Sequence, residues 1–112
     1  MKRFCLALDL INDPVLISEY EQYHVKIWPE IKASIVDSGI LDMHIYRVEN
    51  RLFMIMDVDA AFDFATKSQM DAANPKVEEW ENLMWKYQQA LPNAQPGEKW
   101  RLMEEIFSLH DA

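Results

Sequence analysis

The sequence predicts one α+β domain spanning residues 1–112, in which helices cover one face of an antiparallel sheet. A chain of 112 residues has the usual size of one domain and is too short for two. Hydrophobic residues make up 50% of it and only two residues are glycine, which argues against disordered and collagen-like chains. Short β-favouring runs alternate with segments of helical period in the order β-α-β-β-α-β, and this order indicates the fold class.

The first part of the chain is predicted to form a strand and then an amphipathic helix. Residues 2–10 are a short β-favouring run. Asp13 suits the N-cap of a helix, and Pro14 suits its first helical position. Side chains at three- and four-residue steps then share one helix face: Leu16, Tyr20, Tyr23, His24 and Ile27. Pro29 is expected to kink or restart the helix, and Gly39 to end it.

The second part of the chain is predicted to add a hairpin, two helical stretches and a last strand. Residues 42–48 and 52–58 are β-rich, and the three residues between them suit a hairpin connection. Residues 59–69 are predicted to be helical, and an Asn-Pro pair opens a further helix over residues 74–90. Residues 102–109 are predicted to be the final strand, although the two glutamates in this segment also suit a helix.

This order of elements is the split ferredoxin-like arrangement, which leaves one face of the sheet without helices. No further segment is available to cover that face. A second copy of the chain is the economical cover, so we expect a symmetric homodimer with facing sheets, a dimeric α/β barrel. The helices on one side of each sheet and the partner sheet on the other are expected to enclose a pocket.

Charge and cysteine content limit the partners and the compartment. The formal net charge of −8 disfavours binding to nucleic acid or to an anionic membrane surface. The single cysteine, Cys5, has no partner for an internal disulfide, which suits the reducing cytoplasm. Asp9 interrupts the apolar run near the N-terminus, so this run is interpreted as a strand rather than a signal peptide. No apolar run has the length of a membrane span, and we expect a cytoplasmic protein.

The helix face near residue 20 carries the residues best suited to acid–base chemistry. Tyr20 and His24 are one helical turn apart and share the apolar stripe. An imidazole has an ordinary pKa of about 6.5, so it exchanges protons near neutral pH. Trp80 offers a flat apolar face against which a sugar ring stacks. The spacing leaves another interpretation open, in which His24 is a buried histidine bound to a backbone carbonyl and the other two residues are ordinary core.

Sequence motifs for metals and nucleotide cofactors are missing. No His-x-His, His-x-x-x-His or cysteine pair provides the short ligand spacing of common metal sites. The two glycines, Gly39 and Gly97, stand alone, so no glycine-rich loop cradles a phosphate. We therefore predict a protein without a metal and without a cofactor.

The segment Glu19–Ile31 reads EYEQYHVKIWPEI and resembles the E-Y-x-x-x-H-x-x-I-W-P-E-[LI] signature of the L-rhamnose mutarotase family. Weaker agreement continues through the predicted hairpin and the tryptophan helix, so the likeness covers nearly the whole chain. Members of that family are dimeric ferredoxin-like proteins that interconvert the anomers of L-rhamnose without a cofactor. The resemblance implies that His24 is the proton donor, that Tyr20 binds the sugar and that Trp80 lies against it.

Two positions depart from the family pattern. Met43 stands where those enzymes have a sugar-binding tyrosine, and Trp80-Glu81 stands where they have a Trp-Trp pair. Both changes affect the expected substrate pocket, so we expect the same chemistry on a related monosaccharide, either L-rhamnose or L-fucose. Glu81 is a candidate polar partner for a hydroxyl of inverted configuration. Two other functions stay open on this scaffold, a cofactor-free monooxygenase and a non-catalytic small-molecule binding module.

Overall fold

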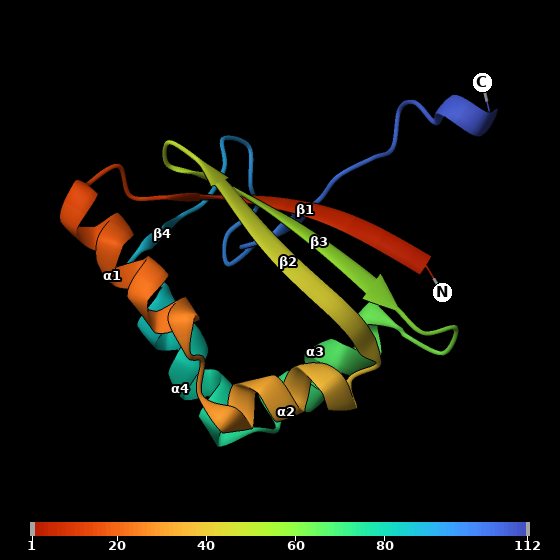
Figure 1. Cartoon of the computed structure of the whole chain (residues 1–112). Coiled ribbons are helices and arrows are strands. Elements are labelled where there is room, and N and C mark those ends of the chain that lie inside the picture. The colour runs from red at the N-terminus through yellow and green to blue at the C-terminus, as the bar shows by residue number, and fades with distance from the viewer. Residues whose placement is uncertain (1, 112) are drawn as a thin grey trace.

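The computed structural model describes residues 2–111 and places four helices on one side of an antiparallel sheet (Figure 1). The elements follow one another along the chain as β1 (Lys2–Leu10), α1 (Pro14–Val25), α2 (Pro29–Asp37), β2 (Ile40–Val48), β3 (Arg51–Val58), α3 (Phe64–Ala72), α4 (Pro75–Met84), β4 (Gln88–Gln89), β5 (Arg101–Leu102) and a short 3₁₀ turn (Leu109–Asp111). The sheet order is β2-β3-β1-β4, with β5 also on β1. The α+β, ferredoxin-like prediction is confirmed.

The sheet is built around the long antiparallel pair of β1 and β3. Their register runs from Lys2 opposite Val58 to Asp9 opposite Arg51. β2 pairs with the other side of β3, with an irregularity just after Ile40. The two short strands share the remaining edge of β1, with β4 near its end and β5 near its middle. All of these pairs are antiparallel.

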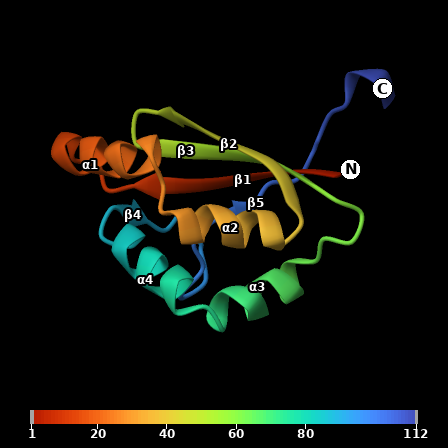
Figure 2. The ribbon, with the colours of Figure 1, turned by 60° about the horizontal axis from the view of Figure 1, so that its bottom comes forward.

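Alternation along the strands sorts the side chains between two faces. Leu6, Leu8 and Leu10 of β1 point toward the helices and are buried, as is Leu52 of β3. Figure 2 shows the helices gathered on this side of the sheet. The opposite face, here called the outer face, carries apolar and aromatic side chains with partial or full exposure: Cys5, Ala7, Tyr46, Val48, Phe53 and Ile55.

The helix starts follow from local capping. The Asp13 carboxylate accepts hydrogen bonds from the backbone N–H groups of Val15 (2.9 Å) and Leu16 (3.2 Å), as an N-cap should. The Asn74 side chain does the same for α4. Of the two outcomes predicted at Pro29, a kink or a restart, the structure shows the restart, because Lys26 is extended and a new helix begins at the proline itself.

The helix predicted for residues 59–69 begins only at Phe64. The backbone N–H of Asp59 donates to the carbonyl of Gly39 (2.9 Å), and its carboxylate accepts from the N–H of Ala61 (3.0 Å). These bonds hold the intervening residues in a turn that covers the end of the sheet. Asp63, not Asp59, then caps the helix by accepting from the N–H of Thr66 (3.0 Å).

The helix predicted to run to about Ala90 ends at Met84. The chain turns over the next three residues, and the carbonyl of Tyr87 accepts a hydrogen bond from the N–H of Ile11 (2.8 Å). Gln88 and Gln89 then pair with Leu10 and Asp9 of β1. Without these two residues the backbone groups along this part of the β1 edge would have no hydrogen-bond partners. Pairing with β1 therefore takes residues 88–89 out of the helix.

The predicted final strand over residues 102–109 is also wrong, because β5 ends at Leu102. The N–H of Met103 still donates to the carbonyl of Cys5 (2.8 Å), and the chain then leaves the sheet (Figure 1). In a continued register Glu104 would face Phe4 on the apolar, helix-facing side. Burying an unpaired carboxylate there costs more than one more ladder hydrogen bond provides. Ile106 is consequently 93% exposed.

Candidate functional site

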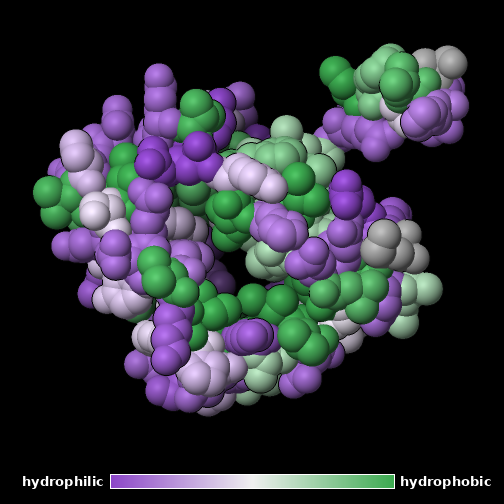
Figure 3. All heavy atoms as spheres, viewed as in Figure 1, coloured by the Kyte–Doolittle hydropathy of each residue, from purple (hydrophilic) through white to green (hydrophobic). Residues whose placement is uncertain are grey.

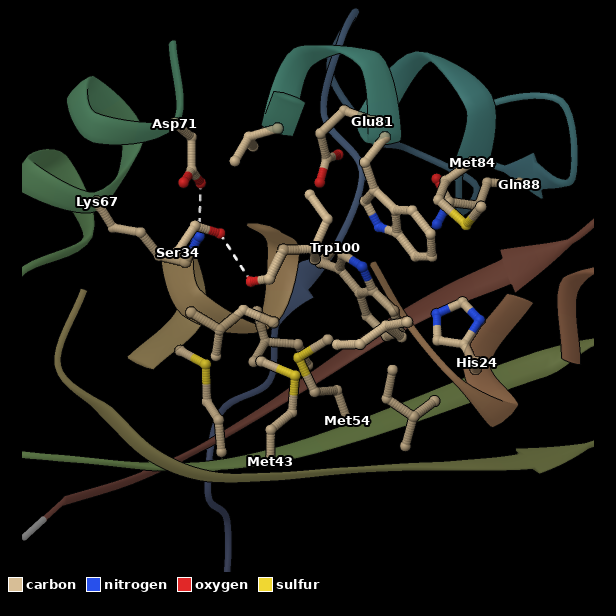
Figure 4. Close-up of a pocket in the computed structure, with 18 of the residues that line it drawn as sticks. His24, Ser34, Met43, Met54, Lys67, Asp71, Glu81, Met84, Gln88 and Trp100 are labelled. Atoms are coloured by element: carbon tan, nitrogen blue, oxygen red, sulfur yellow. Dashed lines mark hydrogen bonds and ion pairs between the residues drawn. The ribbon is translucent and has the colours of Figure 1, made fainter. Parts of the chain in front are cut away.

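A cavity of about 480 Å³ lies between the helix-facing side of the sheet and the helices. This volume is in the usual range for small-ligand sites. Figure 3 shows hydrophobic residues gathered around a hollow in the middle of this side of the molecule. The close-up in Figure 4 shows the methionines Met43 and Met54 below the cavity and Trp100 near its middle. The walls are therefore largely apolar, with polar groups at the two ends.

His24 lies at one end of the cavity, on the last turn of α1. Its Nδ1 is 2.8 Å from the carbonyl oxygen of Tyr20. A carbonyl only accepts hydrogen bonds, so Nδ1 carries the hydrogen and Nε2 keeps a free lone pair in the neutral ring. Burial lowers the pKa of His24 from its ordinary value of 6.5, although the Tyr20 hydrogen bond opposes this shift. The ring is therefore neutral at pH 7, with Nε2 ready to accept a proton.

Tyr20 lies beside His24 and is 4% exposed. The centroids of the two rings are 4.3 Å apart, with an interplanar angle of 34°. Burial raises the pKa of Tyr20 to about 12, while hydrogen bonding with the Gln88 side chain acts in the opposite direction. The phenol is thus protonated at neutral pH and is a donor at the edge of the cavity. The structure brings together the two residues that the sequence singled out on this helix.

Trp80 of α4 completes this end of the cavity from the neighbouring helix. Its ring centroid is 5.6 Å from that of His24 and 5.1 Å from that of Trp28, and both pairs are edge-to-face. This geometry is the favourable one for aromatic pairs and holds the imidazole from the side. Trp80 is also part of the buried core. Trp80 therefore both lines the cavity and packs in the core.

The two positions that depart from the family pattern both line the cavity. Met43 comes from β2 and is half-buried in the cavity floor. Glu81 lies on the α4 side, and its carboxylate is 2.6 Å from Nζ of Lys99. The Lys99 ammonium also donates to the Glu81 carbonyl (2.9 Å). The carboxylate predicted to meet a sugar hydroxyl is thus already paired, although half of its surface stays accessible.

Sequence reasoning missed the polar residues at the other end of the cavity and one beside Tyr20. Lys67 and Asp71 form an ion pair of 2.5 Å on α3, and Ser34 of α2 also lines the cavity (Figure 4). Gln88 of β4 lies at the His24 end. The i,i+4 spacing of Lys67 and Asp71 is visible in the sequence, but such pairs are mostly solvated. No sequence signal marks Gln88, because its segment was predicted to be helical.

Within residues 2–111 no group of three or more histidine, cysteine or acidic side chains is placed to hold a metal ion. No helix in the same range is long and apolar enough to cross a membrane.

Residues 3–109 match the family model described as L-rhamnose mutarotase. The chain belongs to the L-rhamnose mutarotase family. An L-fucose mutarotase from Xanthomonas campestris pv. campestris is 45% identical over 100% of this chain and 91% of its own length. An L-rhamnose mutarotase from Phocaeicola vulgatus is 32% identical over 80% of this chain and 85% of its own.

This mutarotase-family chain also shares its fold with a crystal structure of an L-rhamnose mutarotase from Formosa agariphila. The two match with a TM-score of 0.72 at 22% identity, over 97% of this chain and 99% of the other. The match therefore extends over nearly the whole of both chains. The family resemblance drawn from the segment Glu19–Ile31 is confirmed.

Proposed function

We propose that this chain interconverts the α and β anomers of a 6-deoxy-L-hexose, and that L-fucose is preferred to L-rhamnose. The pairing of His24 with Tyr20 at one end of a cavity large enough for a monosaccharide carries the proposal. The preference for L-fucose is supported by the identity of 45% to an L-fucose mutarotase, against 32% to an L-rhamnose mutarotase. Met43 and Glu81 line the same cavity, so they are placed to act in this choice of sugar.

His24 is assigned to proton transfer in this mechanism. The free lone pair on Nε2 takes the proton from the anomeric hydroxyl as the bond between C1 and the ring oxygen breaks and the aldehyde forms. The imidazolium then returns this proton to the ring oxygen. Both oxygens are bonded to C1, so one nitrogen reaches each in turn. Rotation about the C1–C2 bond and the reverse steps close the ring as the other anomer.

Tyr20 and Trp80 are assigned to holding the sugar. The Tyr20 phenol stays protonated and donates a hydrogen bond to a sugar oxygen beside the imidazole. The Trp80 ring offers an apolar surface to the C–H side of the pyranose and restrains the His24 ring. The apolar walls limit water at the reacting carbon and strengthen these few polar contacts.

The proposal is tested by NMR saturation exchange between the anomers of L-fucose and of L-rhamnose, each with and without the protein. We expect faster exchange for both sugars, with the larger acceleration for L-fucose. Uptake of oxygen with electron-rich aromatic compounds is not expected, and this measurement separates the mutarotase from a monooxygenase on the same scaffold. If the protein does not accelerate exchange for either sugar, the proposal is refuted.

The proposed role of His24 predicts a specific pH dependence. The base form is the neutral ring, and burial places the pKa of His24 below 6.5. Catalysed exchange should therefore be constant around neutral pH and fall with decreasing pH only below 6.5, as the imidazole becomes charged. Exchange rates measured from pH 4.5 to 8, corrected for the uncatalysed reaction, check this. A midpoint above 6.5 would contradict the assignment.

We further propose that the chain acts in the cytoplasm as a homodimer, with the outer faces of two sheets in contact. Tyr46 and Val48 are 58% and 68% exposed on this face, and Phe53 and Ile55 lie between them and β1. Bidentate pairs flank the apolar area, Arg3 with Asp57 and Arg51 with Asp9. An apolar centre with a charged rim is typical of protein interfaces.

The dimer is tested by placing a charge in the outer face. Light scattering coupled to gel filtration should give twice the chain mass of 13.2 kDa for the unmodified protein. Ile55→Glu should give the monomer mass, because burying two unpaired carboxylates opposes association. Val25→Glu is the matched control, since Val25 is 79% exposed on α1. A dimer that survives Ile55→Glu unchanged would place the interface elsewhere.

A further inference from the structure

Gln88 is a buried polar residue in the wall of the cavity. It is the first residue of β4, it is 7% exposed, and its side chain points toward the cavity at the His24 end (Figure 4). Its neighbour Gln89 is exposed. The fold therefore selects one of two adjacent glutamines for the cavity and leaves the other in solvent.

The carbonyl oxygen of this side chain is unused. Oε1 of Gln88 is buried and has no hydrogen-bond partner within residues 2–111. Buried polar atoms nearly always have partners, and one without a partner destabilises the protein. An apolar side chain of similar length would fill the same space without this cost. A ligand that donates a hydrogen bond to Oε1 would explain why a glutamine occupies this position.

Several other polar groups around the cavity already have partners. Lys67 and Asp71 pair with each other at the far end, and Ser34 Oγ donates to the carbonyl of Ile31 (2.8 Å). At the near end His24 Nδ1 donates to the Tyr20 carbonyl. Tyr20 and Gln88 both line this end of the cavity. Gln88 lines the same end of the cavity as His24, so a turn of its side-chain amide presents the unpaired Oε1 atom to a ligand hydroxyl beside His24.

We infer that Gln88 is a specificity-determining residue, whose Oε1 accepts a hydrogen bond from one ring hydroxyl of the sugar bound beside His24. The inference rests on the proposed mutarotase function and deepens it. A hydroxyl of the opposite configuration points away from this acceptor and leaves it unpaired, so the amide discriminates between epimeric sugars. It also fixes the orientation of the ring, which brings C1 to the imidazole.

The test uses Gln88→Met, which keeps the length of the side chain and removes the amide. Anomer exchange is measured for L-fucose and for its 2-, 3- and 4-deoxy analogues, in the unmodified protein and in the variant. In the unmodified protein, removal of the hydroxyl that meets Oε1 should lower exchange efficiency about 10- to 100-fold. In Gln88→Met the same analogue should react about as well as L-fucose does.

Each comparison is a ratio of two sugars within one protein, so differences in the amount of folded protein cancel. Gln89→Met is the matched control and should keep the ratios of the unmodified protein. The melting temperature of Gln88→Met without sugar should be equal or higher, because an unpaired buried acceptor has been removed. A purely structural role for Gln88 predicts a lower melting temperature and unchanged ratios.

Identical ratios in Gln88→Met and the unmodified protein for all three analogues would overturn the inference while the proposed function stands. Loss of the dependence on one hydroxyl, with the other two ratios unchanged, is the supporting result and identifies that hydroxyl. If the unmodified protein accelerates exchange of neither L-fucose nor L-rhamnose, the proposed function fails and the inference falls with it.

Discussion

Replacement of His24 by glutamine should reduce catalysed anomer exchange by about 10²- to 10⁴-fold, which is the usual contribution of a positioned acid–base group. Glutamine is close in size to histidine, and its amide also donates to the Tyr20 carbonyl that now holds Nδ1. It does not accept and release a proton near neutral pH. NMR saturation exchange with L-fucose measures the loss, and circular dichroism checks that the variant stays folded.

His44 provides the matched control for this substitution. It lies on β2 with its side chain 58% exposed, and its Nε2 is 3.0 Å from the Asp42 carboxylate. It does not line the cavity. His44→Gln should therefore exchange anomers at the unmodified rate. If His24→Gln also keeps the full rate while folded, His24 is a packing residue and the non-catalytic interpretation of this helix face holds.

Replacement of Leu52 by alanine should lower the free energy of unfolding by about 2–5 kcal/mol. Leu52 is 2% exposed on the interior strand β3 and belongs to the core cluster that includes Tyr20 and Trp80. The substitution removes apolar contacts and leaves a void that a close-packed core fills only in part. Urea unfolding followed by tryptophan fluorescence measures the change, and the melting temperature should fall by roughly 10–20 °C.

Leu41→Ala is the same chemical change at an exposed site of the neighbouring strand. Leu41 is 61% exposed, so its truncation should change the free energy of unfolding by less than about 0.5 kcal/mol. An equal loss in the two variants would mean that the helix-facing side of the sheet is not the main source of stability. In that case the dimer interface would be the first alternative to examine.

Much of the fold was predictable because its signals are local. Asp13 and Asn74 cap helices through their own side chains. A proline in the interior of a helical segment interrupts the helix, as Pro29 does here. The alternation of Leu6, Leu8 and Leu10 defines a buried face without reference to the rest of the chain. Each of these effects acts within a few residues, so the sequence pattern contains them.

The site was predictable to the extent that it lies on one helix. Tyr20 and His24 are four residues apart on α1, and helical geometry alone brings their rings together. Trp80 joins them from another helix, and its place in the site came from the family resemblance. The orientation of the imidazole, with Nε2 free, depends on a hydrogen bond that no spacing reveals.

The sequence by itself determined the α+β class, the starts of α1, α2 and α4, and the pair of Tyr20 with His24. Only the tertiary structure decided that Gln88 pairs with β1, so that α4 ends before it, and that the chain leaves the sheet after Leu102. It also decided that Gln88 points into the cavity with an unpaired acceptor. The physical reason is that these outcomes depend on which distant backbone edge or apolar face is nearby, and a local pattern carries no information about distant partners.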